Sequence, residues 1–165
     1  MKTILKKIAW VFVVLIAIAG FVVATEYFGG QPLGLFSGSR PVMLGFNAGK
    51  FAPPGWKPNC VSSTVDRSDE KHYIAPLGYS GAGTDAWNKL VTIIKGIPRV
   101  TVITTSSNYI YAEFKSAGMG YVDDVEFALD GKSSVIQVRS ASRLGIRDFD
   151  ANRKRVEAIR AQFGK

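Results

Sequence analysis

Residues Val122–Ser142 read VDDVEFALDGKSSVIQVRSAS and carry the clearest structural pattern of the chain. Apolar and polar residues alternate on both sides of Asp130-Gly131, a dipeptide typical of the turn in a β-hairpin. In the first strand the alternation puts Asp124 and Glu126 on one face and the apolar residues between and beyond them on the other. The stretch therefore predicts an antiparallel hairpin with one apolar and one charged face.

The length of the hairpin loop determines which residues face each other. A four-residue loop over 130–133 sets Asp124 opposite Arg139. The same loop sets Glu126 opposite Gln137. A two-residue turn shifts the register by two residues and keeps the same faces. In either case we expect the acids to lie beside arginine.

Two helices are expected around the strands. Thr84 is expected to cap the first helix, which ends at Gly96. The second is expected to begin at Asp148 or Asp150 and to end near Phe163. The helical spacing predicts inward-facing residues Trp87, Leu90, Val91 and Ile94 in the first helix and Asn152, Val156, Ile159 and Phe163 in the second.

Strands over 73–77, 100–105 and 109–115 precede the hairpin, so the element order is β-α-β-β-β-β-α. Strands joined by short turns pair antiparallel, and amphipathic helices then cover one face of the sheet. We therefore predict an α+β fold with a mainly antiparallel sheet and two helices on one face, preceded by one N-terminal transmembrane helix.

Residues 1–28 carry the signal for that membrane anchor. Three lysines precede Ile8–Ala24, an uncharged apolar run. As a helix, the segment from Ile8 to Phe28 would span roughly 31 Å, close to the thickness of a bilayer core. Because the lysines come first, we expect the N-terminus in the cytoplasm and the rest of the chain in the periplasm. The alternative is a signal peptide cleaved after Ala19 or Ala24, which also exports the remainder.

Residues 29–58 are predicted to be a Gly/Pro-rich tether, and residues 59–165 an exported α+β domain. The tether holds seven Gly and five of the seven Pro of the chain, which disfavour helices and central strands. It also carries large apolar side chains, which we expect to pack against the domain or the bilayer surface. The alternative is a segment that docks a partner.

Composition limits the possible chemistry. The 165 residues include 21 Lys and Arg, 13 Asp and Glu, one Cys and one His. A single Cys excludes a disulfide within the chain, and one Cys with one His excludes a zinc site built from these residues. No cofactor and no metal site is predicted. The basic C-terminal helix would suit nucleic acid, but export removes that partner and leaves anionic lipid headgroups.

Four motifs carry a resemblance to a known family. They are PNCVSS at Pro58–Ser63, GYVDDVEF at Gly120–Phe127, VRSASRLG at Val138–Gly145 and NRKRVE at Asn152–Glu157. In this order they resemble the bacterial and plant family called domain of unknown function 1499, over residues 56–163. The resemblance implies an exported or lumenal domain and no established activity. It points to Cys60, Asp123, Asp124, Glu126, Arg139, Ser140, Ser142, Arg143, Asn152 and Arg153.

Two carboxylates are the main candidates for catalysis. Asp124 and Glu126, roughly 7 Å apart on one face of a strand, could act as acid and base in two-carboxylate hydrolysis. The alternative is a structural network in which Arg139 and Arg143 pair with them. Together with Asp148 the carboxylates could bind Ca²⁺ or Mg²⁺, but the nearby arginines argue against a cation.

Cys60 could be a nucleophile with His72 as its base, or it could have a redox or intermolecular disulfide role, and the alternative to both is a buried thiol. We predict a non-catalytic binding or accessory module on the inner membrane, with its C-terminal domain in the periplasm. Its expected partners are the membrane and either anionic lipid headgroups or an envelope protein, but no nucleic acid. The alternative is an envelope hydrolase that uses Asp124 and Glu126, so enzymatic activity stays open. The predicted binding residues are Asp123, Asp124, Glu126, Arg139, Ser140, Arg143, Asn152 and Arg153.

Overall fold

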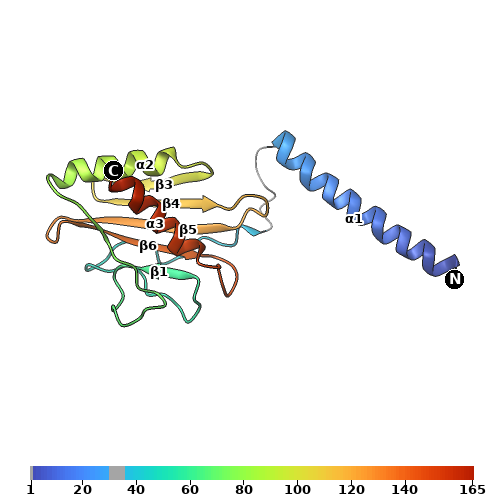
Figure 1. The fold of residues 1–165 in the computed structure, drawn as a ribbon, viewed down its shortest axis with the longest axis horizontal. Helices are drawn as coiled ribbons and strands as arrows, with labels where there is room; N and C mark the ends of the chain where they lie inside the picture. The colour runs from blue at the N-terminus through green and yellow to red at the C-terminus, as the bar shows by residue number, and fades with distance from the viewer. Residues whose placement is uncertain (1, 30–35) are drawn as a thin grey trace.

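The computed structural model describes residues 2–29 and 36–165, and in the first helix it describes the side chains of Ile4 and of residues 6–21. That helix, α1, spans Lys2–Gly29 and lies apart from the α+β domain (Figure 1). Among the described residues, no helix combines the length and the hydropathy that a membrane span requires.

The domain is built on one antiparallel sheet. Its strands are β1 Cys60–Ser62, β2 Leu77–Gly78, β3 Val100–Thr105, β4 Tyr109–Lys115, β5 Val122–Asp130 and β6 Val135–Ser142. Across the sheet the order is β1-β6-β5-β4-β3, and β2 pairs with the same edge of β6 as β1 does. The long strands β5 and β6 therefore lie at the centre and carry the charged residues singled out above.

Two helices, α2 at Gly83–Gly96 and α3 at Ala151–Phe163, cover one face of this sheet (Figure 1). Their predicted inner residues are buried, apart from the partly buried Val91: Trp87, Leu90 and Ile94 in α2, and Asn152, Val156, Ile159 and Phe163 in α3. They pack on sheet residues that are fully buried, including Ile110, Val125, Phe127 and Val138. The predicted α+β fold with two helices on one face of a mainly antiparallel sheet is confirmed.

The predicted hairpin register is wrong by two residues. Glu126 pairs with Arg139, and Asp124 pairs with Ala141. The reason is that the four-residue loop begins one residue later than predicted, at Gly131, so that Asp130 still belongs to the strand. Because the shift is even, every side chain stays on its predicted face.

Two other local predictions also differ from the structure. Thr84 does not cap α2, since the helix begins at Gly83 and Ala82 holds the cap position without a side-chain hydrogen bond. The strand expected over 73–77 is reduced to β2, and Tyr73 makes only an isolated bridge to Ser62. The short edge strand β1 was not predicted, because three residues are too few to show an alternating pattern.

Candidate functional site

The face of the sheet opposite the helices carries a closed network of acids and arginines. Asp124 is 1% exposed and accepts hydrogen bonds from Arg143 (Nη2 to Oδ1, 2.7 Å; Nε to Oδ2, 3.0 Å) and from the Tyr111 hydroxyl (2.6 Å). Arg143 Nη2 also lies 2.5 Å from Glu113 Oε1. Arg40 donates to the same oxygen from Nε (2.8 Å) and Nη2 (2.7 Å). Asp124 is thus held by buried partners, as the structural alternative predicted.

Glu126, which is completely buried, forms the second half of this network. Its Oε2 accepts from Arg139 Nη1 at 3.3 Å, and its Oε1 accepts from the Tyr109 hydroxyl at 2.7 Å and from the Gly45 backbone N–H at 2.6 Å. Arg139 Nε donates to the Ala52 carbonyl at 3.1 Å. A buried charge is tolerated only when it is paired in this way.

The hydroxyl and guanidinium groups around the acids keep their protons. Burial raises the pKa of Tyr109 and of Tyr111, and the hydrogen bond that each makes to a carboxylate raises it further. Burial lowers the pKa of Arg143, but the hydrogen bonds to its acidic partners outweigh that effect and raise the pKa above its ordinary value. These residues are therefore stable donors to the carboxylates.

The segment predicted as a tether covers this network. Besides Gly45 and Ala52, the Ser37 carbonyl accepts from Arg143 Nη1 at 3.4 Å, and Phe51 is buried against the domain. Over its described part, residues 36–58, the segment packs on the sheet through only some of its apolar side chains, among them Phe51, whereas Val42, Met43 and Trp56 are 71–100% exposed. The side chains of Asp124, Glu126, Arg139 and Arg143 are at most 10% exposed, so the carboxylates are shielded from solvent.

Asp123 lies on the opposite, helix-covered face. It forms an ion pair with Arg155 of α3, and the same guanidinium donates to the Ser140 hydroxyl (3.0 Å) and to Asn152 Oδ1 (2.6 Å). The Asn152 amide in turn donates to Asp148 Oδ2 at 2.8 Å. Asp148 Oδ2 also accepts from the Asn152 backbone N–H at 2.9 Å, which caps the first turn of α3. This second network fastens α3 to the sheet.

The basic side chains of α3 are largely used inside the fold. Arg153 Nη1 donates to the Tyr73 carbonyl at 2.9 Å, and Arg160 Nη1 donates to the Pro76 carbonyl at 2.7 Å. These arginines hold the segment 70–76, which leads into β2, against the helix. The predicted role of this helix in contacting headgroups is therefore less favoured than its structural role.

Cys60 and His72 do not show the features of a nucleophile and its base. Burial raises the pKa of the Cys60 thiol, which keeps it protonated and poorly nucleophilic. His72 Nδ1 lies 2.8 Å from Asp69 Oδ2, and Nε2 lies 3.1 Å from the Lys57 carbonyl oxygen. The geometry favours the buried-thiol alternative. Among the described residues no three His, Cys, Asp or Glu side chains are grouped to hold a metal ion.

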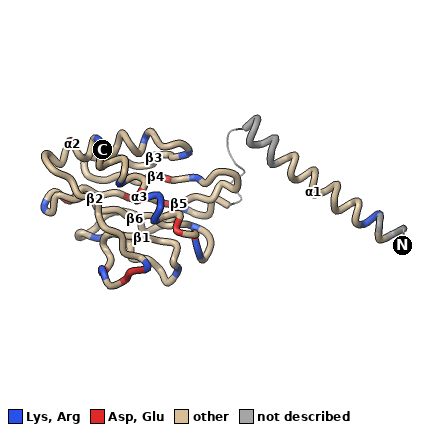
Figure 2. Tube along the Cα trace, in the orientation of Figure 1, with Lys and Arg blue, Asp and Glu red and all other residues tan. Residues whose placement is uncertain are grey.

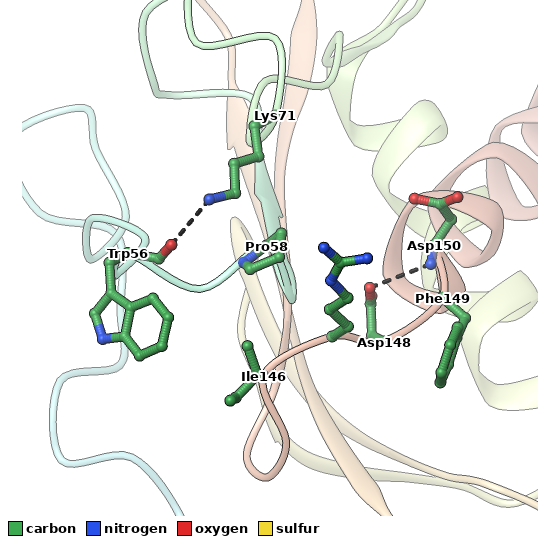
Figure 3. Close-up of a pocket in the computed structure, with 8 residues that line it drawn as sticks. Trp56, Pro58, Lys71, Ile146, Asp148, Phe149 and Asp150 are labelled. Atoms are coloured by element: carbon green, nitrogen blue, oxygen red, sulfur yellow. Dashed lines mark hydrogen bonds between the residues drawn. The ribbon is translucent and has the colours of Figure 1, made fainter.

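Two cavities flank the connection from β6 to α3, here called the 144–150 loop. The first, of about 560 Å³, is lined by Trp56, Pro58, Lys71, Ile146, Arg147, Asp148, Phe149 and Asp150. Figure 3 shows Trp56 and Lys71 on one side of it and Asp148, Phe149 and Asp150 on the other. The second, of about 280 Å³, is lined in part by Tyr121, Asp123, Ser142, Leu144, Arg147 and Phe149. Of the predicted binding residues, Asp123 lines the second cavity.

A family model described as Protein of unknown function (DUF1499) matches residues 50–163. The chain belongs to the DUF1499 family. No curated protein shows significant similarity to the chain. The match begins six residues before the region that the motifs indicated, so it includes part of the segment that covers the acidic face.

The motif residues of this DUF1499 domain divide between the two networks. Asp124, Glu126, Arg139 and Arg143 meet on the covered face, whereas Asp123, Ser140, Ser142 and Asn152 meet under α3. Sequence reasoning missed Tyr109, Tyr111 and Glu113, although their alternation along β4 places all three on the face of Asp124.

Sequence reasoning also missed the exposed apolar surface of the 144–150 loop. The pattern that could have indicated it is the presence of Leu144, Ile146 and Phe149 in an otherwise polar connection, and each of these side chains is exposed.

Proposed function

We propose that this DUF1499 protein is a single-pass protein of the inner membrane, anchored by α1, whose domain faces the periplasm. There it acts as a non-catalytic binding or accessory module. In this proposal residues 1–28 form the anchor, and the domain is held near the bilayer surface by the chain that follows.

The observation that carries the proposal is the uncovered apolar surface of α1. Trp10, Phe12, Ile16 and Phe21 are 60–73% exposed, and residues 6–21 of the helix, whose side chains the structure describes, include no Asp or Glu (Figure 2). A helix that is apolar on all sides is stable only in apolar surroundings, which a bilayer supplies. The lysines at its start favour a cytoplasmic N-terminus.

A binding role is supported better than hydrolysis. Two-carboxylate hydrolysis needs one carboxyl group to give a proton to a substrate that reaches it. Asp124 and Glu126 instead accept hydrogen bonds from arginine and tyrosine on a covered face. The exposed side chains of Trp56, Arg147 and Phe149 instead line a cavity beside the 144–150 loop.

The partners that we propose are the inner membrane and, at the domain surface, anionic lipid headgroups. An envelope protein is the second candidate. Export leaves nucleic acid outside the reach of the domain. Among the basic side chains near these exposed aromatic residues, Lys71 and Arg147 line the larger cavity, and Lys57 Nζ lies 6.0 Å from the centre of the Trp56 ring.

Membrane association of the full chain tests the proposal. In a Gram-negative host, we expect the protein to stay in membranes washed with alkaline carbonate and to have the intact mass of all 165 residues. A variant with Val14→Arg and Ile16→Arg should leave the membrane fraction, because each arginine is unfavourable in the bilayer core. A control with Gly131→Arg and Ser133→Arg, in the exposed hairpin loop, should remain. A soluble product that lacks the N-terminal segment would show a cleaved signal peptide and refute the anchor.

A further inference from the structure

The 144–150 loop exposes apolar side chains around a cavity. Leu144 is 39% exposed, Ile146 57% and Phe149 86%. Trp56, which is 72% exposed, lines the same cavity as Ile146 and Phe149 (Figure 3). Apolar side chains gathered on one surface mark a contact with a partner or a membrane.

The backbone at Phe149 is strained in a way that folding does not explain. Phe149 and Asp150 have φ angles of 54° and 65°, in the left-handed region that bulky side chains avoid. Because Phe149 is exposed, its side chain contributes little to packing within the domain. Neither packing nor the preferred backbone conformation therefore explains why a phenylalanine occupies this position. Strain kept at an exposed aromatic residue points to a function for that side chain.

The chain from α1 enters the domain beside this loop. The Phe36 ring lies 5.1 Å from the ring of Tyr121, which lines the smaller cavity together with Leu144 and Phe149. Two residues further on, a Cβ atom at Gly38 would lie 3.1 Å from Leu144 Cγ. The seven Cα–Cα steps from Gly29 to Phe36 span at most about 25 Å. With α1 in a membrane, the 144–150 loop is therefore close to the bilayer surface.

The charges on this surface fit a lipid interface. Arg147 is exposed, and its side chain has no hydrogen bond or ion pair among the described residues. Lys71 Nζ donates to the Trp56 carbonyl at 2.9 Å. Two acids are also present: Asp148 is engaged at the start of α3, and Asp150 is exposed. Because the acids offset part of the positive charge, apolar insertion contributes more to this contact than attraction to anionic lipids.

We propose that the 144–150 loop, together with Trp56, is a second membrane contact that inserts Ile146 and Phe149 into the outer surface of the bilayer in which α1 lies. Aromatic and basic side chains are the usual pair at this depth. The contact orients the domain, so that its two cavities face the lipid headgroups. This inference rests on the proposed anchor, because the anchor places the loop near lipid.

A fluorescent probe in the full chain tests the contact. The chain carries Cys60→Ala and Ile146→Cys, is labelled with an environment-sensitive dye and is placed in nanodiscs that contain spin-labelled lipid. The control is the same chain with Lys132→Cys, in the exposed β5–β6 loop, in place of Ile146→Cys. We expect the dye at position 146 to be quenched by lipid at least about twofold more than the dye at position 132.

A second variant separates insertion from folding. Phe149→Asn suits the left-handed backbone, so the labelled chain should keep its fold but lose most of the quenching at position 146. Equal quenching at positions 146 and 132, or no effect of Phe149→Asn, would overturn the contact and leave the anchor intact. A dye that is shielded without being quenched by lipid would indicate a protein partner and would also overturn it. A chain that does not enter nanodiscs would refute the anchor, and this inference with it.

Discussion

Asp124 is the residue on which the covered network depends most directly. Its carboxylate satisfies Arg143 and Tyr111 in a nearly solvent-free space. We expect Asp124→Asn to lower the free energy of unfolding by about 3 kcal/mol, because it removes the more buried of the two carboxylates that pair with Arg143 and leaves only Glu113. Urea denaturation measures this change.

The control for this prediction is Glu157→Gln. Glu157 pairs with Arg160 on the exposed surface of α3, at 2.9 Å, and exposed pairs contribute about 0.5 kcal/mol or less. If Asp124→Asn were as mild as this control, the carboxylate would not be structural and a role in binding or catalysis would regain support.

A substitution at Phe149 is expected to stabilise the fold, in contrast to Asp124→Asn. Replacement by Asn should raise the free energy of unfolding by about 1 kcal/mol, because it relieves a bulky side chain held at a positive φ. Thermal and chemical denaturation of the variant measure the gain. A loss of stability would show that the Phe149 side chain supports the fold, which would contradict a functional origin of its backbone strain.

The carboxyl group of Glu113 makes the stability of the covered network depend on pH. Burial raises its pKa, but hydrogen bonds from Arg143 and Arg40 outweigh that effect and hold the pKa below its ordinary value. Its stabilising contribution is therefore complete above the unfolded pKa of about 4.3 and is lost as the pH falls through the lower folded-state pKa.

Denaturation at a series of pH values tests this effect. We expect the loss of stability between about pH 5 and pH 3 to be steeper in the natural protein than in Glu113→Gln. The variant still carries other acids that titrate in this range, so the slope should decrease rather than disappear. An unchanged slope would mean that Glu113 has the same pKa in the folded and unfolded chain.

At the level of the elements, the alternation in β4, β5 and β6 was enough to assign faces and to predict the antiparallel sheet. The register could not be predicted, because Asp130-Gly131 suits more than one loop length and Ser134 adopts a positive φ that no propensity indicates. The short strand β1 and the cover formed by residues 36–58 depend on contacts distant in sequence. Such contacts leave no periodic pattern, so the closure of the charged face could not be foreseen.

Removal of part of the covering segment, residues 36–58, should destabilise the fold. A chain that begins at Lys50, where the family match starts, lacks the Gly45 N–H that binds Glu126 and the Arg40 that binds Glu113. We expect it to be at least about 2 kcal/mol less stable than a chain that begins at Phe36, because hydrogen bonds to buried charges are lost. Denaturant midpoints compare the two. Equal stability would show that residues 36–49 are dispensable to the fold.

For the whole molecule, two structural networks hold a small sheet between two helices on one side and an irregular segment on the other. The charged motif residues that first suggested a site form ion pairs and hydrogen bonds within those networks. Exposed side chains that include Ile146, Arg147 and Phe149 instead lie around the 144–150 loop, beside the point where the chain from α1 enters. We therefore propose this surface, near the N-terminal helix, as the contact site of the molecule.

The side of the membrane on which Lys165 lies tests the proposed anchor and the periplasmic domain most directly. Two reporters are fused in turn to the C-terminus. The first is alkaline phosphatase, which needs disulfides and so becomes active only outside the cytoplasm. The second is a fluorescent protein that folds in the cytoplasm. We expect an active phosphatase and a dark fluorescent protein. A bright fluorescent protein with an inactive phosphatase would contradict the anchor, the periplasmic domain and the lipid contact together.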